Sequence, residues 1–152
     1  MPSNAALTMQ CNVAEVPSIV YLPGSWDLLH PGHIAAINLA AQYGSKLIVG
    51  VESDELVVAS KGRAPIMGEQ ERALLVGSLK KVAQTIIYRD HDYISLLQKL
   101  RAGTFCLSDQ CREVRHQKAV AAAEKAGIRV VRIPYSQGFS SVQIKAKIRE
   151  AR

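Results

Sequence analysis

The chain has 152 residues, enough for one domain, and its composition of 48% hydrophobic and 21% charged residues excludes a disordered or collagen-like protein. No uncharged apolar run approaches the roughly 18 residues that span a bilayer, which argues against a membrane-spanning helix. Lysine and arginine total 19 against 13 acidic residues, and the net charge of +6 favours a polyanionic partner, either nucleic acid or a phosphorylated small molecule.

The N-terminal segment, residues 1–16, is polar and aperiodic, with neither a basic leader nor the apolar core of a signal peptide. We therefore expect a flexible tail at residues 1–16 and one globular domain over residues 17–152. The three cysteines form no CxxC pair and leave one thiol over, which fits a reducing compartment better than a disulfide framework. The sequence thus predicts a cytoplasmic protein.

Short β-rich runs alternate with helical segments through the rest of the chain. The β-rich runs predict five strands, at residues 18–22, 46–51, 85–88, 104–107 and 129–133. Apolar residues at helical spacing predict helices at 33–43, 69–82, 117–126 and 141–151, and a short one capped by Asp92. This alternation predicts an α/β fold, a Rossmann-like three-layer αβα sandwich with a five-stranded parallel sheet. Ligands of such sheets bind outside the carboxyl ends of the strands, so we expect the chemistry in the turns there.

The turn after the first strand, residues 22–33, carries the richest set of functional residue types. His30 and His33 lie three residues apart where the strand gives way to a helix, and Gly24 and Gly32 let the backbone approach a ligand closely. A helix that begins here directs free N–H groups and a partial positive charge toward the strand ends. These features predict a phosphate site. Two alternatives are a zinc site, for which no third ligand lies nearby in sequence, and histidines satisfied by the backbone of a tight turn.

The decapeptide GSWDLLHPGH at residues 24–33 resembles the G-x-[FW]-D-x-x-H-x-G-H signature of the cytidylyltransferase-like nucleotidyltransferases. The resemblance covers residues 18–150. It continues in the family's order through LIVGVESD at 47–54, KGRAP at 61–65, EQER at 69–72 and GFSSVQI at 138–144.

The resemblance implies an enzyme that transfers a nucleoside monophosphate, with CMP favoured, from an NTP to a small phosphorylated acceptor and releases pyrophosphate. One alternative is an adenylyltransferase that uses ATP on a sugar 1-phosphate of the heptose type or on FMN. A more remote one is a non-catalytic nucleotide-binding protein. The resemblance also implies Mg²⁺ bound with the NTP, no metal ligands from the protein, and a homodimer. We expect no membrane insertion, and no nucleic-acid partner, because aromatic residues make up only 5% of the chain.

The catalytic roles implied by the resemblance fall on four residues. His30 and His33 would hold phosphates and stabilise the charge of the transition state, and Lys61 and Arg72 would neutralise phosphate in the same pocket. Without its sequence context, Lys61 would be interpreted as a solvated surface residue. Nucleotide contacts are expected from the residues Pro23, Gly24, Ser25, Trp26, Gly32, Asp109, Ser140 and Ser141.

Some of the polar residues have a structural interpretation as well. Ser140 and Gln143 form a capping-box pattern, and a capped helix N-terminus also binds phosphate oxygens. Asp27 is expected to anchor the turn. The loop at residues 90–92 fits a helix cap at Asp92 better than a metal clamp.

The chain departs from its relatives in two segments. Residues 108–111 read SDQC where glycerol-3-phosphate cytidylyltransferases carry a GDDW-like segment, and residues 135–138 read YSQG in place of Arg-Thr-Glu-Gly. Arg132 is a candidate for the missing cation. These departures leave the choice between CTP and ATP open, and the acceptor as well.

Overall fold

The computed structural model describes residues 18–134 and 138–151, so the tail expected at residues 1–16 lies outside the described residues. Five parallel strands form one sheet within this part of the chain, in the order β3-β2-β1-β4-β5. They are β1 (Ile19–Gly24), β2 (Lys46–Glu52), β3 (Gln84–Tyr88), β4 (Thr104–Ser108) and β5 (Arg129–Ile133). The helices are α1 (Pro31–Ala40), a 3-10 turn (Ala41–Tyr43), α2 (Asp54–Lys61), α3 (Glu69–Gly77), α4 (Tyr93–Leu100), α5 (Val114–Lys125) and α6 (Ser141–Glu150).

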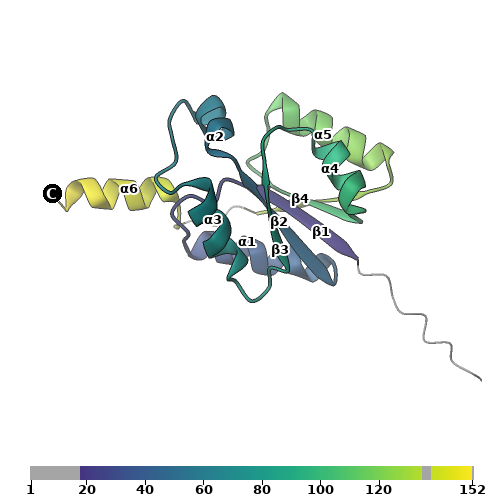
Figure 1. Cartoon of the computed structure of the whole chain (residues 1–152), viewed down its shortest axis with the longest axis horizontal. Coiled ribbons are helices and arrows are strands. Elements are labelled where there is room, and N and C mark those ends of the chain that lie inside the picture. Colours follow the sequence, from purple (N-terminus) through teal and green to yellow (C-terminus); the bar gives the residue numbers. More distant parts are fainter. Residues whose placement is uncertain (1–17, 135–137, 152) are drawn as a thin grey trace, which may run out of the picture.

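The sheet is covered on both faces, which confirms the predicted three-layer fold (Figure 1). Successive side chains of a strand point to opposite faces. Val20, Leu22 and Val49 therefore pack with α1 and α3, whereas Tyr21 and Ile48 pack with α4 and α5. Burial on both faces explains why β2 and β4 read in the sequence as continuous apolar runs. Helix α6 extends away from these layers (Figure 1).

The strand order reverses at β1. From β1 the chain continues to β2 and β3 on one side of the sheet, and it then returns to form β4 and β5 on the other. The segments that leave the carboxyl ends of β1 and β4 diverge at such a reversal, and the crevice between them is where open α/β sheets bind ligands. The turn at residues 22–33 follows β1, so the fold places it at this crevice.

Several helix boundaries differ from the sequence prediction. Helix α1 begins at Pro31 and not at residue 33, because proline is well tolerated in the first turn, and His30 becomes its N-cap. Helix α3 ends at Gly77, not at residue 82, where the Ser78 N–H and hydroxyl both bond to the Leu74 carbonyl. Helix α5 begins at Val114, not at residue 117.

Helix α2 has no counterpart in the sequence prediction. Val57 is its only buried residue, so its sequence lacks the apolar stripe that identifies an amphipathic helix. Its ends nevertheless carry ordinary signals. The Ser53 hydroxyl accepts a hydrogen bond from the Leu56 N–H at 3.3 Å, and Gly62 ends the helix in the left-handed region with φ of 68°. The helix carries Lys61, one of the expected site residues, in its last turn.

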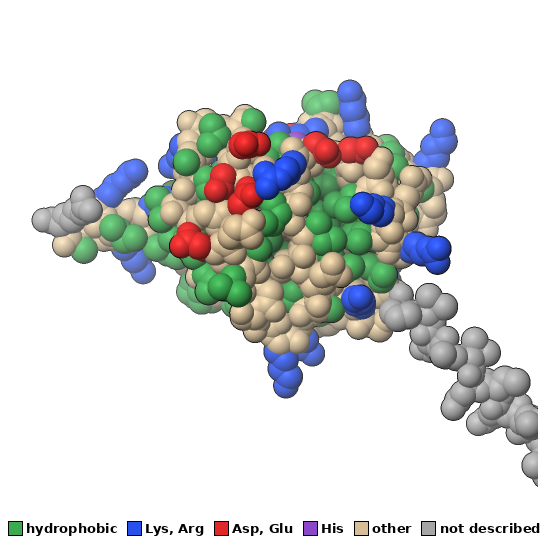
Figure 2. Space-filling view, in the orientation of Figure 1, with side chains coloured by type: hydrophobic (Ala, Val, Ile, Leu, Met, Phe, Trp, Pro, Cys, Tyr) green, Lys and Arg blue, Asp and Glu red, His purple; other side chains and the backbone are tan. Residues whose placement is uncertain are grey.

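No helix among the described residues is long and apolar enough to cross a membrane. Figure 2 shows lysine and arginine side chains spread over one face of the molecule and around its rim, while acidic side chains lie over the left and upper part of this face. On this face the positive charge forms no continuous patch of the kind that follows a nucleic-acid backbone.

Candidate active site

Two adjoining cavities lie at the carboxyl ends of the strands. The larger, which we call the histidine cavity, has a volume of about 380 Å³ and is lined by His30, His33 and residues around the N-terminus of α6. The smaller, which we call the tyrosine cavity, has a volume of about 200 Å³ and is lined by Tyr88 and Tyr93 among others. The two cavities share the lining residues Pro23, Gly24, Ser25, Lys61, Cys111, Glu113 and His116.

His30 and His33 stack on each other in the wall of the histidine cavity. Their ring centroids are 3.7 Å apart and their planes differ by 23°. His30 caps α1, and its Nδ1 accepts a hydrogen bond from the Gly32 N–H at 3.1 Å, so the proton of a neutral His30 is on Nε2. The His33 ring packs at an angle against Trp26, with centroids 5.2 Å apart. Both imidazoles are thus held at a helix N-terminus.

The two stacked rings are neutral at physiological pH. Burial lowers the pKa of His30. Burial, together with the charges of His30 and Lys61, lowers the pKa of His33 to about 4. A neutral imidazole has one N–H to donate, so the pair is suited to bind phosphate oxygens by hydrogen bonding. The Nδ1 of His33 is buried and has no hydrogen-bond partner among the described residues.

The glycines of the turn are required by close contacts. Trp26 is 5% exposed, and its Nε1 donates to the Gly50 carbonyl at 2.8 Å. A Cβ on Gly24 would come within 2.7 Å of the Trp26 ring, and a Cβ on Gly32 within 3.0 Å of the His30 ring. Trp26 itself has a φ of 58°, a strained conformation for a bulky residue. The turn is therefore built around the positions of the tryptophan and the histidines.

Asp27 occupies the anchoring position that the sequence analysis expects. Its carboxylate accepts hydrogen bonds from the N–H groups of Ile66 and Met67 at 3.0 and 3.1 Å and pairs with Lys145 of α6 at 3.1 Å. Burial alone would raise the pKa of Asp27, but these donors outweigh burial and lower the pKa. The Asp27 carbonyl also accepts a hydrogen bond from the Ser141 hydroxyl at 3.1 Å. Asp27 thus joins the turn to two distant segments.

The two cations predicted for the site lie in different environments. Lys61 lines both cavities, and its Nζ donates to the Ser25 hydroxyl at 2.8 Å. Arg72 is fully buried, and its guanidinium donates to the carbonyls of Ser25 and Met67 and forms an ion pair with Asp54 at 2.6 Å. Arg72 is not among the residues that line either cavity. The geometry therefore suits Lys61 for contact with phosphate, and Arg72 for holding the segment that carries Ser25.

The N-terminus of α6 contributes to the same cavity as the histidines. Ser140 is its N-cap, with the hydroxyl accepting a hydrogen bond from the Gln143 N–H at 3.2 Å. Ser140 and Ser141 both line the histidine cavity. The N-termini of α1 and α6 thus meet at one cavity, where their free N–H groups can bind phosphate oxygens. Residues 135–137, in one of the two departing segments, lie outside the described residues.

The loop after β4 lines one side of the histidine cavity. Ser108 and Gln110 are among the lining residues, whereas Asp109, one of the expected nucleotide contacts, is not. Arg132, the candidate for the missing cation, donates to the carbonyls of Ser108 at 3.3 Å and Cys111 at 3.0 Å. Its observed contacts therefore hold this loop.

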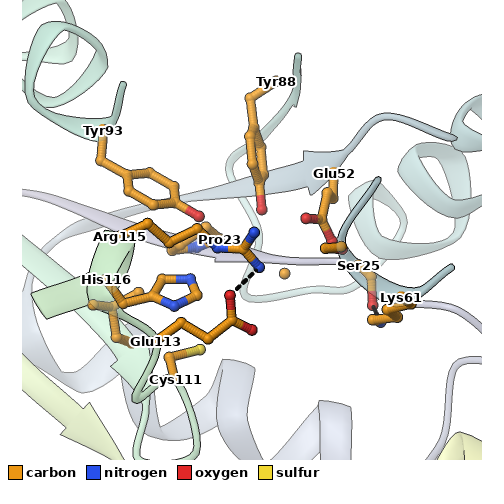
Figure 3. Close-up of a pocket in the computed structure, with 13 residues that line it drawn as sticks. Pro23, Ser25, Glu52, Lys61, Tyr88, Tyr93, Cys111, Glu113, Arg115 and His116 are labelled. Atoms are coloured by element: carbon orange, nitrogen blue, oxygen red, sulfur yellow. Dashed lines mark hydrogen bonds and ion pairs between the residues drawn. The ribbon is translucent and has the colours of Figure 1, made fainter. Parts of the chain in front are cut away.

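The tyrosine cavity contains polar side chains that the sequence analysis did not single out (Figure 3). Glu52 ends β2, Tyr88 ends β3, Tyr93 begins α4, and Arg115 and His116 belong to the first turn of α5. The signal that could have identified the first two is their position, since each is the last residue of a predicted or observed strand at the functional edge of the sheet. Tyr93 in α4 and Arg115 and His116 in α5 lie several residues beyond the ends of β3 and β4. Only the tertiary structure shows that these residues meet Glu52 and Tyr88 in one cavity.

No group of three or more His, Cys, Asp or Glu side chains that could hold a metal ion occurs among the described residues. The zinc alternative for His30 and His33 therefore lacks a third ligand within this part of the chain.

Comparison with known proteins adds an independent line of evidence. A family model described as cytidylyltransferase-like matches residues 21–149. The bifunctional protein HldE of Koribacter versatilis is 31% identical over 139 residues, which cover 85% of this chain and 26% of that protein. HldE of Helicobacter acinonychis is 29% identical over 153 residues, which cover 99% of this chain and 32% of that protein. The chain thus spans about a quarter to a third of the length of these curated relatives.

A solved structure is also similar. The lipopolysaccharide core biosynthesis protein from Thermoplasma volcanium superposes with a TM-score of 0.66 at 26% sequence identity, covering 80% of this chain and 98% of that one. The family match extends over most of the described sheet and includes the turn with both histidines. The chain therefore belongs to the cytidylyltransferase-like family.

Proposed function

We propose that the chain is an adenylyltransferase that joins the AMP portion of ATP to a sugar 1-phosphate of the heptose type. An oxygen of the acceptor phosphate attacks the α-phosphorus of ATP, and a new P–O bond forms. The bond from that phosphorus to the oxygen bridging to the β-phosphate breaks, and pyrophosphate leaves. The second pKa of a phosphate monoester is about 6, so the attacking oxygen is already ionised at neutral pH and needs no general base.

The observation that carries this proposal is the position of Lys61 and the neutral histidine pair beside two adjoining cavities. Two anionic reactants must approach each other, so the site has to supply donors and positive charge where they meet. Lys61 lines both cavities and supplies the charge. His30 and His33 supply N–H groups next to the N-terminus of α1. None of these groups has to lose or gain a proton during the transfer.

The sizes of the cavities suggest which substrate enters each of them. The histidine cavity, at about 380 Å³, falls within the range of about 300–1,000 Å³ that is typical of small-molecule sites. We assign it to the nucleotide. The tyrosine cavity, at about 200 Å³, suits a smaller acceptor.

The preference for ATP over CTP rests on the relatives. The sequence analysis favours CMP transfer, whereas the HldE relatives support its alternative, adenylyl transfer to heptose 1-phosphate. The similar solved structure is described as a lipopolysaccharide core biosynthesis protein, which also fits a sugar acceptor. We therefore propose ATP as the nucleotide.

We further propose that Mg²⁺ enters with the nucleotide, since Mg²⁺ in such sites is held largely by substrate phosphates and water. The homodimer implied by the resemblance stays a prediction, which sedimentation equilibrium would measure.

A pyrophosphate-release assay with crossed substrates tests the proposed reaction. ATP and CTP are each combined with heptose 1-phosphate, glycerol 3-phosphate, phosphoethanolamine and FMN in the presence of Mg²⁺. We expect release with ATP and the sugar 1-phosphate. Turnover with CTP but not ATP would contradict the adenylyl assignment, and turnover with FMN alone would contradict the sugar acceptor. Nucleotide binding without turnover on any acceptor would support the non-catalytic alternative.

Replacement of Lys61 tests the role of the lining that the histidine cavity and the tyrosine cavity share. Lys61→Gln should lower kcat/KM by about 100-fold, as expected for removal of one group that stabilises transition-state charge. The matched control is Lys118→Gln, which removes the same charge from an exposed position of α5 and should leave kcat/KM unchanged. Equal activity of the two variants would contradict the placement of Lys61 between the substrates.

A further inference from the structure

The tyrosine cavity contains a buried carboxylate that has no role in the proposed reaction. Glu52 is 7% exposed, and its carboxylate points toward the interior of the cavity (Figure 3). The Glu52 Oε1 lies 3.4 Å from the Nε2 of His91, and that nitrogen has no hydrogen-bond partner among the described residues. Among the described residues no lysine or arginine forms an ion pair with Glu52. A carboxylate removed from water in this way is costly unless hydrogen-bond donors reach it.

Donors and acceptors are mixed around this carboxylate. Burial raises the pKa of Tyr88 and Tyr93 well above the usual value, so both hydroxyls keep their protons. Arg115 projects into the same space, where it forms an ion pair with Glu113 at 2.6 Å (Figure 3). The Arg115 Nε and the His116 Nδ1 are buried and have no hydrogen-bond partner among the described residues. The hydrogen-bonding groups of this lining therefore find only some of their partners within the described part of the protein.

The chemistry of the lining restricts what can bind there. Glu52 would repel a phosphate, and Arg115 beside it makes the site unfavourable for an ammonium group. Hydroxyl groups suit both residues, because one hydroxyl can donate to the carboxylate while another accepts from the guanidinium. The rings of Tyr88 and Tyr93 add an apolar surface on which the C–H faces of a sugar can pack. The volume of about 200 Å³ suits a single ring and not a tricyclic flavin.

We propose that Glu52 is a specificity-determining residue whose carboxylate accepts hydrogen bonds from hydroxyl groups of the acceptor sugar. The sugar occupies the tyrosine cavity. Its phosphate lies beside Lys61, where the tyrosine cavity adjoins the histidine cavity that holds the nucleotide. This inference rests on the proposed function, since it assigns a binding mode to the sugar of the proposed acceptor.

The variant Glu52→Gln tests this inference, because glutamine keeps the shape of the side chain and removes the charged acceptor. A hydrogen bond to a charged group contributes about 1.5–3 kcal/mol, so we expect KM for the sugar 1-phosphate to rise by about 10- to 100-fold. The dissociation constant of ATP, followed by the fluorescence of Trp26 in the histidine cavity, should not change. The matched control is Glu55→Gln, which removes the same charge from an exposed position of α2.

Sugar 1-phosphates that each lack one hydroxyl separate recognition from a structural effect. For the analogue that lacks the recognised hydroxyl, wild type and Glu52→Gln should have similar KM values. An unchanged KM for the parent sugar in Glu52→Gln would overturn the inference. An equal rise in KM for the parent and for every analogue would also overturn it, because Glu52 would then act only through the structure, for example by holding His91.

Direct binding keeps this inference distinct from the proposed function. Calorimetry of the sugar 1-phosphate with wild type and Glu52→Gln, in the presence of an ATP analogue with a methylene between the α- and β-phosphorus, needs no turnover. If the sugar 1-phosphate binds Glu52→Gln more weakly than wild type, the role of Glu52 is supported, whatever the reaction. If wild type forms no product from the same sugar and ATP, the proposed reaction is contradicted. If wild type bound no sugar 1-phosphate, both proposals would fail.

Discussion

Two histidine rings stacked at 3.7 Å disfavour simultaneous protonation, because two like charges at this distance would repel each other. Burial and the neighbouring Lys61 keep the pKa of His33 low, and the Gly32 N–H fixes the orientation of the His30 ring. Among the described residues that line the histidine cavity, Lys61 then carries the positive charge. Arg72, also basic, is occupied by Ser25, Met67 and Asp54.

Replacement of His33 should change how stability depends on pH. The pKa of about 4 in the folded protein lies below the ordinary 6.5, so the unfolded chain binds more protons between these values. The contribution of the neutral ring is therefore complete above pH 6.5 and is lost as pH falls from 6.5 toward 4. Between pH 7 and pH 5, wild type should lose about 2 kcal/mol more of its free energy of unfolding than His33→Gln does.

Urea denaturation at the two pH values measures this difference. His33→Gln is the appropriate comparison because its amide does not titrate while every other ionisable group is retained. An equal loss of unfolding free energy in the two proteins would contradict the low pKa of His33.

At the scale of elements, the site is assembled from the ends of helices and strands. The turn after β1 carries the histidines, α2 delivers Lys61, and α6 contributes a capped N-terminus. Asp27 links the turn to α6 through Lys145 and Ser141. These segments are far apart in sequence, so the site forms only when the whole domain has folded.

The close approach of Gly24 to the Trp26 ring leads to a prediction about the stability of glycine-to-alanine variants. Gly24→Ala would bring a Cβ within 2.7 Å of a ring that is fixed by its hydrogen bond to Gly50, and overpacking of this kind costs about 1–3 kcal/mol. Gly77→Ala is the matched control. The Cβ of this alanine would lie at an ordinary 3.5 Å from the Thr85 side chain. Gly77 itself belongs to α3, and alanine stabilises a helix by up to about 1 kcal/mol over glycine.

The free energy of unfolding in urea should therefore fall for Gly24→Ala and be unchanged or rise for Gly77→Ala. Nucleotide binding should weaken only in the first variant, because displacement of Trp26 disturbs His33. A Gly24→Ala protein as stable as wild type would show that the turn tolerates a side chain at this position.

At the scale of the whole molecule, the fold can be predicted from the sequence pattern. The candidate site can be predicted from it only in part. Continuous apolar runs at residues 46–51 and 104–107 identified central strands because both faces of the sheet are buried. Helix α2 was not predicted, since only Val57 among its residues is buried and its signals lie in the caps. The motif that carries His30 and His33 is local and therefore readable from the sequence.

Other parts of the site depend on distant contacts. The buried position of Arg72 arises from Ser25 and Asp54, which lie 47 and 18 residues away in the chain. The tyrosine cavity joins the ends of β2 and β3 to α4 and α5, and no spacing in the sequence indicates that Glu52 and Arg115 share it. The histidine cavity was therefore largely predictable from the sequence, whereas the tyrosine cavity was not.

The central proposal is that an oxygen of the sugar acceptor's phosphate is the nucleophile that forms the new bond to the α-phosphorus of ATP. Its most direct test uses a sugar 1-phosphate with ¹⁸O in the three non-ester oxygens of its phosphate, unlabelled ATP, and mass spectrometry of both products. The account predicts that the nucleotide sugar retains all three labels, one of them bridging its two phosphorus atoms, and that pyrophosphate carries none. Label in pyrophosphate, or no labelled nucleotide sugar at all, would contradict it.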